Sequence, residues 1–73
     1  MTNHAEVIVT MPFTDALTYV FRGGRVRKLE WDDPLFWGQL HEGQLMLHEP
    51  DGLFHPWILS YSDLAGDDWV IWE

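Results

Sequence analysis

Four cationic side chains lie close together in this chain, and they are the first candidates for binding a charged ligand. They fall within seven positions: Arg22, Arg25, Arg27 and Lys28. The formal net charge is −8, and residues 29–73 carry ten acids and neither Lys nor Arg. Because affinity for long DNA or RNA depends on neutralising many phosphates, we expect no long nucleic acid as a partner. A compact cationic patch can hold a small anion, or the four side chains can simply solvate a helix end and an edge strand.

Tryptophan is the second residue type with binding chemistry. The 73 residues include five: Trp31, Trp37, Trp57, Trp69 and Trp72. Stacking on a base contributes about 1–3 kcal/mol, and a charge-assisted hydrogen bond to phosphate about 1.5–3 kcal/mol. Two stacks and one arginine contact give roughly 4–9 kcal/mol, whereas nanomolar binding needs about 12.3 kcal/mol. A tight site would therefore have to be enclosed, for example between subunits; the alternative is that each indole belongs to a core or an interface.

Residue patterns for catalysis are weak. The chain has no cysteine, no Gly-x-Ser-x-Gly motif and no glycine-rich loop that opens a helix. Three histidines recur every seven residues: His41, His48 and His55. An odd spacing alternates between the two faces of a strand, so they cannot line one metal site within a strand. Two acidic pairs beside turns could hold Mg²⁺, but such pairs are common: Asp32-Asp33 and Asp67-Asp68. We expect no catalytic residue, no metal and no cofactor.

The elements that would position these residues follow from periodicity. An apolar stripe repeats at three and four residues between Pro12 and Gly23, which predicts an amphipathic helix: Phe13, Ala16, Leu17, Val20 and Phe21. Short strands are predicted over 26–31, 35–40, 44–48, 54–59 and 69–72, with a hairpin turn at Glu42-Gly43. Residues 60–66 read as a helical turn capped by Ser60 or Ser62. The prediction is one α+β domain over 11–73, with a helix on an antiparallel sheet.

Residues 1–10 are predicted to be an N-terminal extension, in which 7–9 could form a short edge strand or a segment docked on a neighbour. Apolar residues make up 47% of the chain and occupy both faces of several predicted strands. One helix can cover only one face, so we expect a homo-oligomer. No apolar run approaches the ~20 residues of a membrane span, and no signal-peptide pattern is present, so we expect a cytoplasmic protein without a membrane partner.

Three segments resemble the phage anti-Thoeris sponge proteins in order and spacing: 11–17 (Met-Pro-Phe-Thr-Asp-Ala-Leu), 24–31 (Gly-Arg-Val-Arg-Lys-Leu-Glu-Trp) and 63–69 (Asp-Leu-Ala-Gly-Asp-Asp-Trp). The resemblance spans about 11–72. It implies a homotetramer, a dimer of dimers, that sequesters a cyclic ADP-ribose-type signal without cleaving it; some relatives hold cyclic di- or trinucleotides of other antiphage systems. Two departures are Lys28, where the family often has arginine, and Gly66-Asp67 in the last motif. The extension has no counterpart.

The resemblance and the residue chemistry together select candidate ligand-binding residues. Trp31 and Trp69 would pack on a base or ribose, Arg27 would bind phosphate, and Asp68 would accept from ribose hydroxyls or pair with Arg27. Three further candidates are Trp37, Trp57 and Ser60. The leading hypothesis is sequestration of a cyclic nucleotide signal. An acidic protein-interaction inhibitor of a host defence enzyme or nuclease is the first alternative, and a cyclic nucleotide hydrolase the second.

Overall fold

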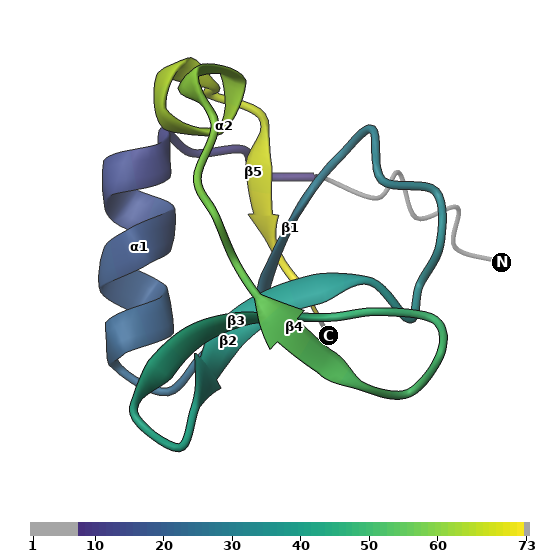
Figure 1. Cartoon of the computed structure of the whole chain (residues 1–73). Helices are drawn as coiled ribbons and strands as arrows, with labels where there is room; N and C mark the ends of the chain where they lie inside the picture. Colours follow the sequence, from purple (N-terminus) through teal and green to yellow (C-terminus); the bar gives the residue numbers. More distant parts are fainter. Residues whose placement is uncertain (1–7, 73) are drawn as a thin grey trace, which may run out of the picture.

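Residues 8–72 are described in the computed structural model, and this part of the chain forms two helices and five strands (Figure 1). In chain order they are α1 (Phe13–Phe21), β1 (Val26–Lys28), β2 (Trp37–His41), β3 (Gln44–His48), β4 (Phe54–Pro56), α2 (Tyr61–Ala65) and β5 (Trp69–Ile71). The predicted α+β fold, with a helix on an antiparallel sheet, is confirmed. Within residues 8–72 no helix has the length and apolarity to cross a membrane.

The five strands form one antiparallel sheet in the order β4-β3-β2-β1-β5. The β2–β3 hairpin closes through the predicted pair Glu42-Gly43, where φ is 54° and 79°. Positive φ at both central positions matches the right-handed twist of the flanking strands, and glycine adopts it without strain. On the other side of β2, strand β1 pairs with β5 so that Arg27 lies opposite Val70.

The core lies between α1 and one face of the sheet. Three aromatic side chains fill its centre, and we call them the core aromatics: Phe13, Trp57 and Trp69. The Phe13 ring centroid lies 5.2 Å from that of Trp69 and 5.9 Å from that of Trp57, in tilted and edge-on geometries that favour aromatic contact. Trp57 packs over β2 at Gly38, where a Cβ atom would lie 2.3 Å from the indole. Glycine is therefore needed at this position for close approach.

The sheet face opposite α1 is not bare, because stacked rings occupy it. Trp37 lies parallel to His48 at 3.8 Å and against Trp72 at 4.3 Å, and only 7% of Trp37 is exposed. The row continues through Phe54 to His41, whose rings stack at 3.9 Å. The protomer itself therefore covers part of this face with its own aromatic side chains.

Most predicted strands are longer than the observed ones. Strand β1 stops at Lys28, because the chain turns there and the Trp31 N–H donates to the Lys28 carbonyl at 3.0 Å. Strand β4 stops at Pro56, which has no N–H to donate and lies on an edge strand as its chemistry requires. Residues 8 and 9 form no strand, and Val7 of the predicted edge strand lies outside the described residues.

The helix ends agree more closely with expectation. Asp15 lies in the first turn of α1, and Ser60 caps α2 in a capping box with Asp63: the Ser60 side chain accepts from the Asp63 N–H at 3.2 Å, and Asp63 accepts from the Ser60 N–H at 3.0 Å. The second predicted cap candidate, Ser62, lies inside α2. These caps orient the segment that leads into β5.

Replacing Gly38 by alanine should lower the free energy of unfolding by about 1–3 kcal/mol, because a buried indole would have to move. Urea unfolding measures the change. Gly24→Ala is the matched control, since its Cβ meets the exposed and movable ring of Tyr19 and the loss should be smaller. Equal losses in both variants would contradict the packing described at Trp57.

Candidate functional site

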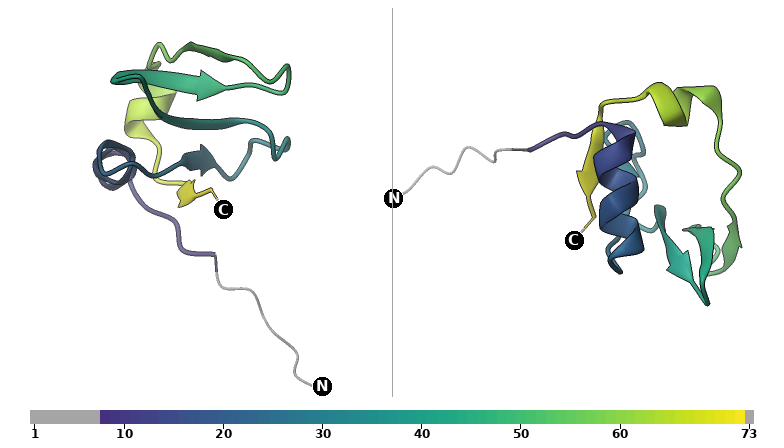
Figure 2. Two further views of the ribbon diagram at one scale, coloured as in Figure 1. Left: turned by 90° about the horizontal axis from the view of Figure 1, so that it is seen from below. Right: turned by 90° about the vertical axis from the view of Figure 1, so that its left-hand side faces the viewer.

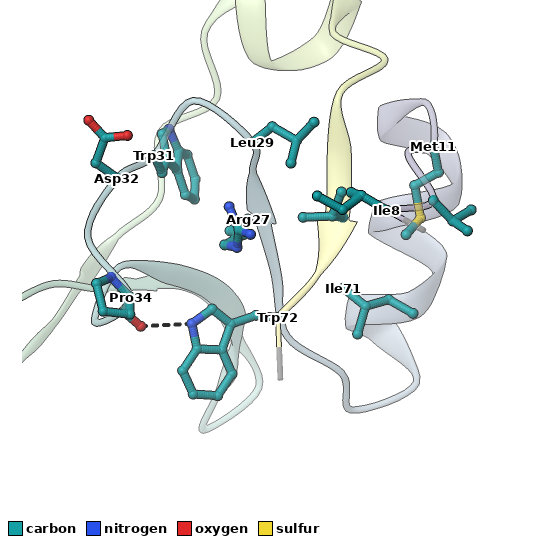
Figure 3. A pocket seen from close by; sticks show the side chains of 11 residues that line it. Ile8, Met11, Arg27, Leu29, Trp31, Asp32, Pro34, Ile71 and Trp72 are labelled. Carbon is teal, nitrogen blue, oxygen red and sulfur yellow. Dashed lines mark hydrogen bonds between the residues drawn. The ribbon is translucent and has the colours of Figure 1, made fainter. Parts of the chain in front are cut away.

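One hollow in the surface collects side chains suited to binding. Its volume is about 850 Å³, and it lies at the β1–β5 pair on the side away from α1 (Figure 3). Its lining combines one guanidinium, two indoles, one carboxylate and apolar groups: Ile8, Val9, Met11, Arg27, Leu29, Trp31, Asp32, Pro34, Val70, Ile71 and Trp72. Two of the residues predicted from sequence, Arg27 and Trp31, are among them.

Arg27 is the cation of this hollow. Its neighbours Val26 and Lys28 are buried against the helix side, so strand alternation turns Arg27 to the opposite face, where it is half-buried. One guanidinium nitrogen donates to the Lys28 carbonyl at 3.3 Å. None of the carboxylates in residues 8–72 forms an ion pair with it, so the charge is available to a ligand.

Two indoles flank Arg27 (Figure 3), and each is held by a fixed partner. Phe36 stacks on Trp31 with ring centroids 4.5 Å apart, and Trp31, which lines the hollow, also contacts Trp69 and Trp57 edge-on at 5.4 and 6.4 Å. The Trp72 indole N–H donates to the Pro34 carbonyl at 2.7 Å. Rings that are already positioned lose little conformational entropy when a ligand stacks on them.

Asp32 supplies the one carboxylate of the lining, next to Trp31 in the chain. An ionised carboxylate accepts hydrogen bonds and donates none, so it suits hydroxyl or amino groups of a ligand. Leu29 and Val70 add apolar groups to the lining. The arrangement can bind an anionic group at Arg27, a flat ring beside an indole and a hydroxyl at Asp32.

The other sequence candidates lie elsewhere in this protomer. Trp69 is fully buried and its indole N–H donates to the Asp63 carbonyl at 3.1 Å, while Trp57 belongs to the core aromatics. Ser60 is the cap of α2. The Asp68 carbonyl accepts from Leu29 N–H at 3.1 Å and so anchors β5 beside β1.

Trp37 lies on the same sheet face as Arg27, behind Trp72. Its indole N–H donates to Gln39 at 2.7 Å, and the Arg25 guanidinium lies 4.9 Å from its ring centroid. Trp37 therefore supports Trp72 rather than lining the hollow.

The fold divides the cationic cluster. Lys28 faces the helix side with 6% exposed, and its ammonium lies 3.7 Å from Asp63 and 5.7 Å from the Trp69 ring centroid. Arg22 follows α1 at its C-terminal end. Of the four cationic side chains, only those of Arg25 and Arg27 lie on the sheet face opposite α1. The compact patch expected from the sequence is therefore reduced to a pair.

Sequence reasoning missed Trp72 and Asp32 as lining residues. Alternation along 69–72 places Val70 and Trp72 on one face, and this signal was present in the sequence. That this face is also the face of Arg27 depends on the Arg27–Val70 register, which the sequence does not show.

Among residues 8–72 no group of three metal-ligating side chains comes together, around His41, His48, His55 or elsewhere. His55 instead pairs with Asp51 at 2.9 Å in the β3–β4 turn. The hydrogen bond that the His55 imidazole donates to the Asp51 carboxylate raises the pKa of His55 above its ordinary 6.5. The Leu53 N–H, and then His55, lower the pKa of Asp51 below 3.8.

A family comparison agrees with this description. The Thoeris anti-defense 2-like domain matches residues 11–72, and the chain belongs to this family. Its role is therefore anti-defence, directed against Thoeris. A search of curated proteins found no match.

The His55–Asp51 pair gives a test of the turn geometry. Asp51→Asn should return the pKa of His55 toward 6.5, because the charged acceptor is removed. The pair stabilises the fold only while Asp51 is ionised and His55 protonated: this contribution disappears as pH falls through the lowered pKa of Asp51 or rises through the raised pKa of His55. An NMR titration of the imidazole in both proteins measures the shift. An unchanged His55 pKa would contradict the contact.

Proposed function

We propose that this protein sequesters, without cleaving it, a cyclic nucleotide signal of antiphage defence: a cyclic ADP-ribose isomer or a cyclic di- or trinucleotide. The observation that carries the proposal is the position of Arg27 between Trp31 and Trp72 in one hollow. A cyclic nucleotide carries phosphates, flat bases and ribose hydroxyls, and the lining offers a partner for each. Family membership supports the same class of ligand.

The geometry also supports binding in preference to turnover. Hydrolysis of a phosphate or glycosidic bond requires a positioned base or nucleophile, and often a metal. The ionisable side chains of the hollow are Arg27 and Asp32, and Asp32 is exposed. An exposed, hydrated carboxylate is well suited to accept hydrogen bonds from the hydroxyl groups of a ligand. We therefore assign both residues to ligand recognition.

We further propose that copies of the chain associate, as a tetramer. The surface that supports this is an apolar patch at α2, formed by Ile58, Tyr61 and Leu64, which are 85%, 84% and 54% exposed. Tyr61 and Leu64 lie three residues apart on α2 and so share one face of that helix, and exposed apolar surface is what a protein–protein contact would cover. The same patch on an acidic protein also suits a host protein, which is the alternative mode of inhibition.

Arg27→Gln should weaken binding of cyclic ADP-ribose or a cyclic dinucleotide by roughly 10- to 150-fold, because one charge-assisted hydrogen bond is lost. Isothermal titration measures the change. Arg22→Gln is the matched control: it makes the same change of charge at the end of α1, away from the hollow. Equal affinities for both variants would reject Arg27 as the phosphate ligand.

Heat-denatured complexes should release the cyclic nucleotide unchanged. Chromatography of the supernatant after prolonged incubation checks this, and a linear product would assign the chain to the hydrolases instead.

Static light scattering should give the mass of a tetramer, which is four times the 8.6 kDa of one chain. Tyr61→Ser combined with Leu64→Ser should lower that mass, since both side chains are largely exposed in the protomer. Leu53→Ser, at another exposed apolar residue, is the control. A monomeric wild-type protein would exclude self-association and favour the host-protein partner.

A further inference from the structure

We propose that residues 8–10 add to β5 as a sixth strand and that this strand forms one wall of the ligand-binding hollow. The evidence for the strand is the backbone pairing of Met11 with Trp69. The role of the strand in ligand binding depends on the proposed function. Residues 1–10 lie outside the region that matches the family, so the strand would be a specificity segment added to the family domain.

The first pair of this strand is already formed. Met11 and Trp69 exchange two backbone hydrogen bonds, from Met11 N–H to the Trp69 carbonyl at 2.8 Å and from Trp69 N–H to the Met11 carbonyl at 3.2 Å. In an antiparallel ladder the next pair of this type lies two residues along each strand. The continuation of this register therefore joins Val9 to Ile71.

The outer edge of β5 is open at that position. Val70 lies opposite Arg27, and the Trp72 N–H donates to the Arg25 carbonyl at 2.9 Å, so the even-numbered residues of this stretch point their backbone groups to β1. Strand alternation then directs the N–H and carbonyl of Ile71 to the opposite edge, where Trp69 meets Met11. Val9 is the residue in register to pair with them.

The segment leaves this edge before the pair is made. In Figure 2 the purple residues before α1 lead away from β5. Val9 is 71% exposed and Ile71 39% exposed, and no hydrogen bond joins them in the described residues. Pairing would satisfy backbone groups and bury both side chains, so a small input of binding energy would be enough to favour it.

The same register determines what faces the ligand. Residues of an added strand alternate in face, so Val9 would share the side of Ile71 and Val26, while Ile8 and Thr10 would share the side of Arg27. Ile8 would then lie opposite Trp72. Ile8 already lines the hollow, and in the paired strand it becomes a fixed apolar wall against a base or ribose.

Two proline variants of the full chain separate the effect of losing a backbone hydrogen bond of the strand from the effect of introducing proline. Val9→Pro removes the N–H that would donate to the Ile71 carbonyl. Thr10→Pro removes an N–H that the strand would point to solvent, so it is the matched control. Both positions are exposed, and urea unfolding should show equal stability. The readouts are amide hydrogen exchange at Ile71 and the affinity for cyclic ADP-ribose.

Saturating cyclic ADP-ribose should slow Ile71 exchange by about tenfold or more in the wild type and in Thr10→Pro, and much less in Val9→Pro. Val9→Pro should also bind about fivefold or more weakly than Thr10→Pro. Equal exchange and equal affinity in the two variants would overturn the proposal. Ile71 protection that rises with protein concentration would also overturn it, because the strand would then come from a second copy.

Failure of the proposed function has a different signature. If the wild type binds neither a cyclic ADP-ribose isomer nor a cyclic di- or trinucleotide, the ligand assignment fails, and the strand is judged on the unliganded variants. Slower Ile71 exchange in Thr10→Pro than in Val9→Pro would support the strand, and identical exchange would reject it.

Discussion

Contact among the core aromatics is the interaction on which the rest of the structure depends. Phe13 comes from α1, Trp57 from the segment after β4 and Trp69 from β5, so one cluster joins parts of the chain that are far apart in sequence. The cluster requires a flat site on β2, which Gly38 provides. By holding β5 beside β1, it brings Trp72 to the same face as Arg27.

Strand alternation explains why two adjacent cations have different roles. Lys28 turns toward the helix side and is paired with Asp63, which is costly to disrupt because its charge is buried. Arg27 turns the other way and keeps its guanidinium for the hollow. The net charge of −8 makes the chain as a whole unfavourable for polyanions such as long nucleic acids.

Local signals predicted the elements of the fold well. The apolar stripe gave α1, the Glu42-Gly43 pair gave the hairpin, and Ser60 gave the cap of α2, because each depends on residues close in sequence. Strand ends were predicted less well. Trp57 has strong strand propensity, yet β4 ends before it: its N–H still donates to the Leu45 carbonyl of β3 at 3.2 Å, while its indole packs in the core against Phe13 and Trp69.

By itself, the sequence determined the fold class and the absence of disulfides, and it offered seven candidate binding residues, of which Arg27 and Trp31 line the hollow. It could not place Trp72 and Asp32 beside them, nor separate the buried Trp69 from an indole that lines the hollow. The physical reason is that a hollow is defined by register between distant strands. Only the pairing of β1 with β5 decided which side chains share a face.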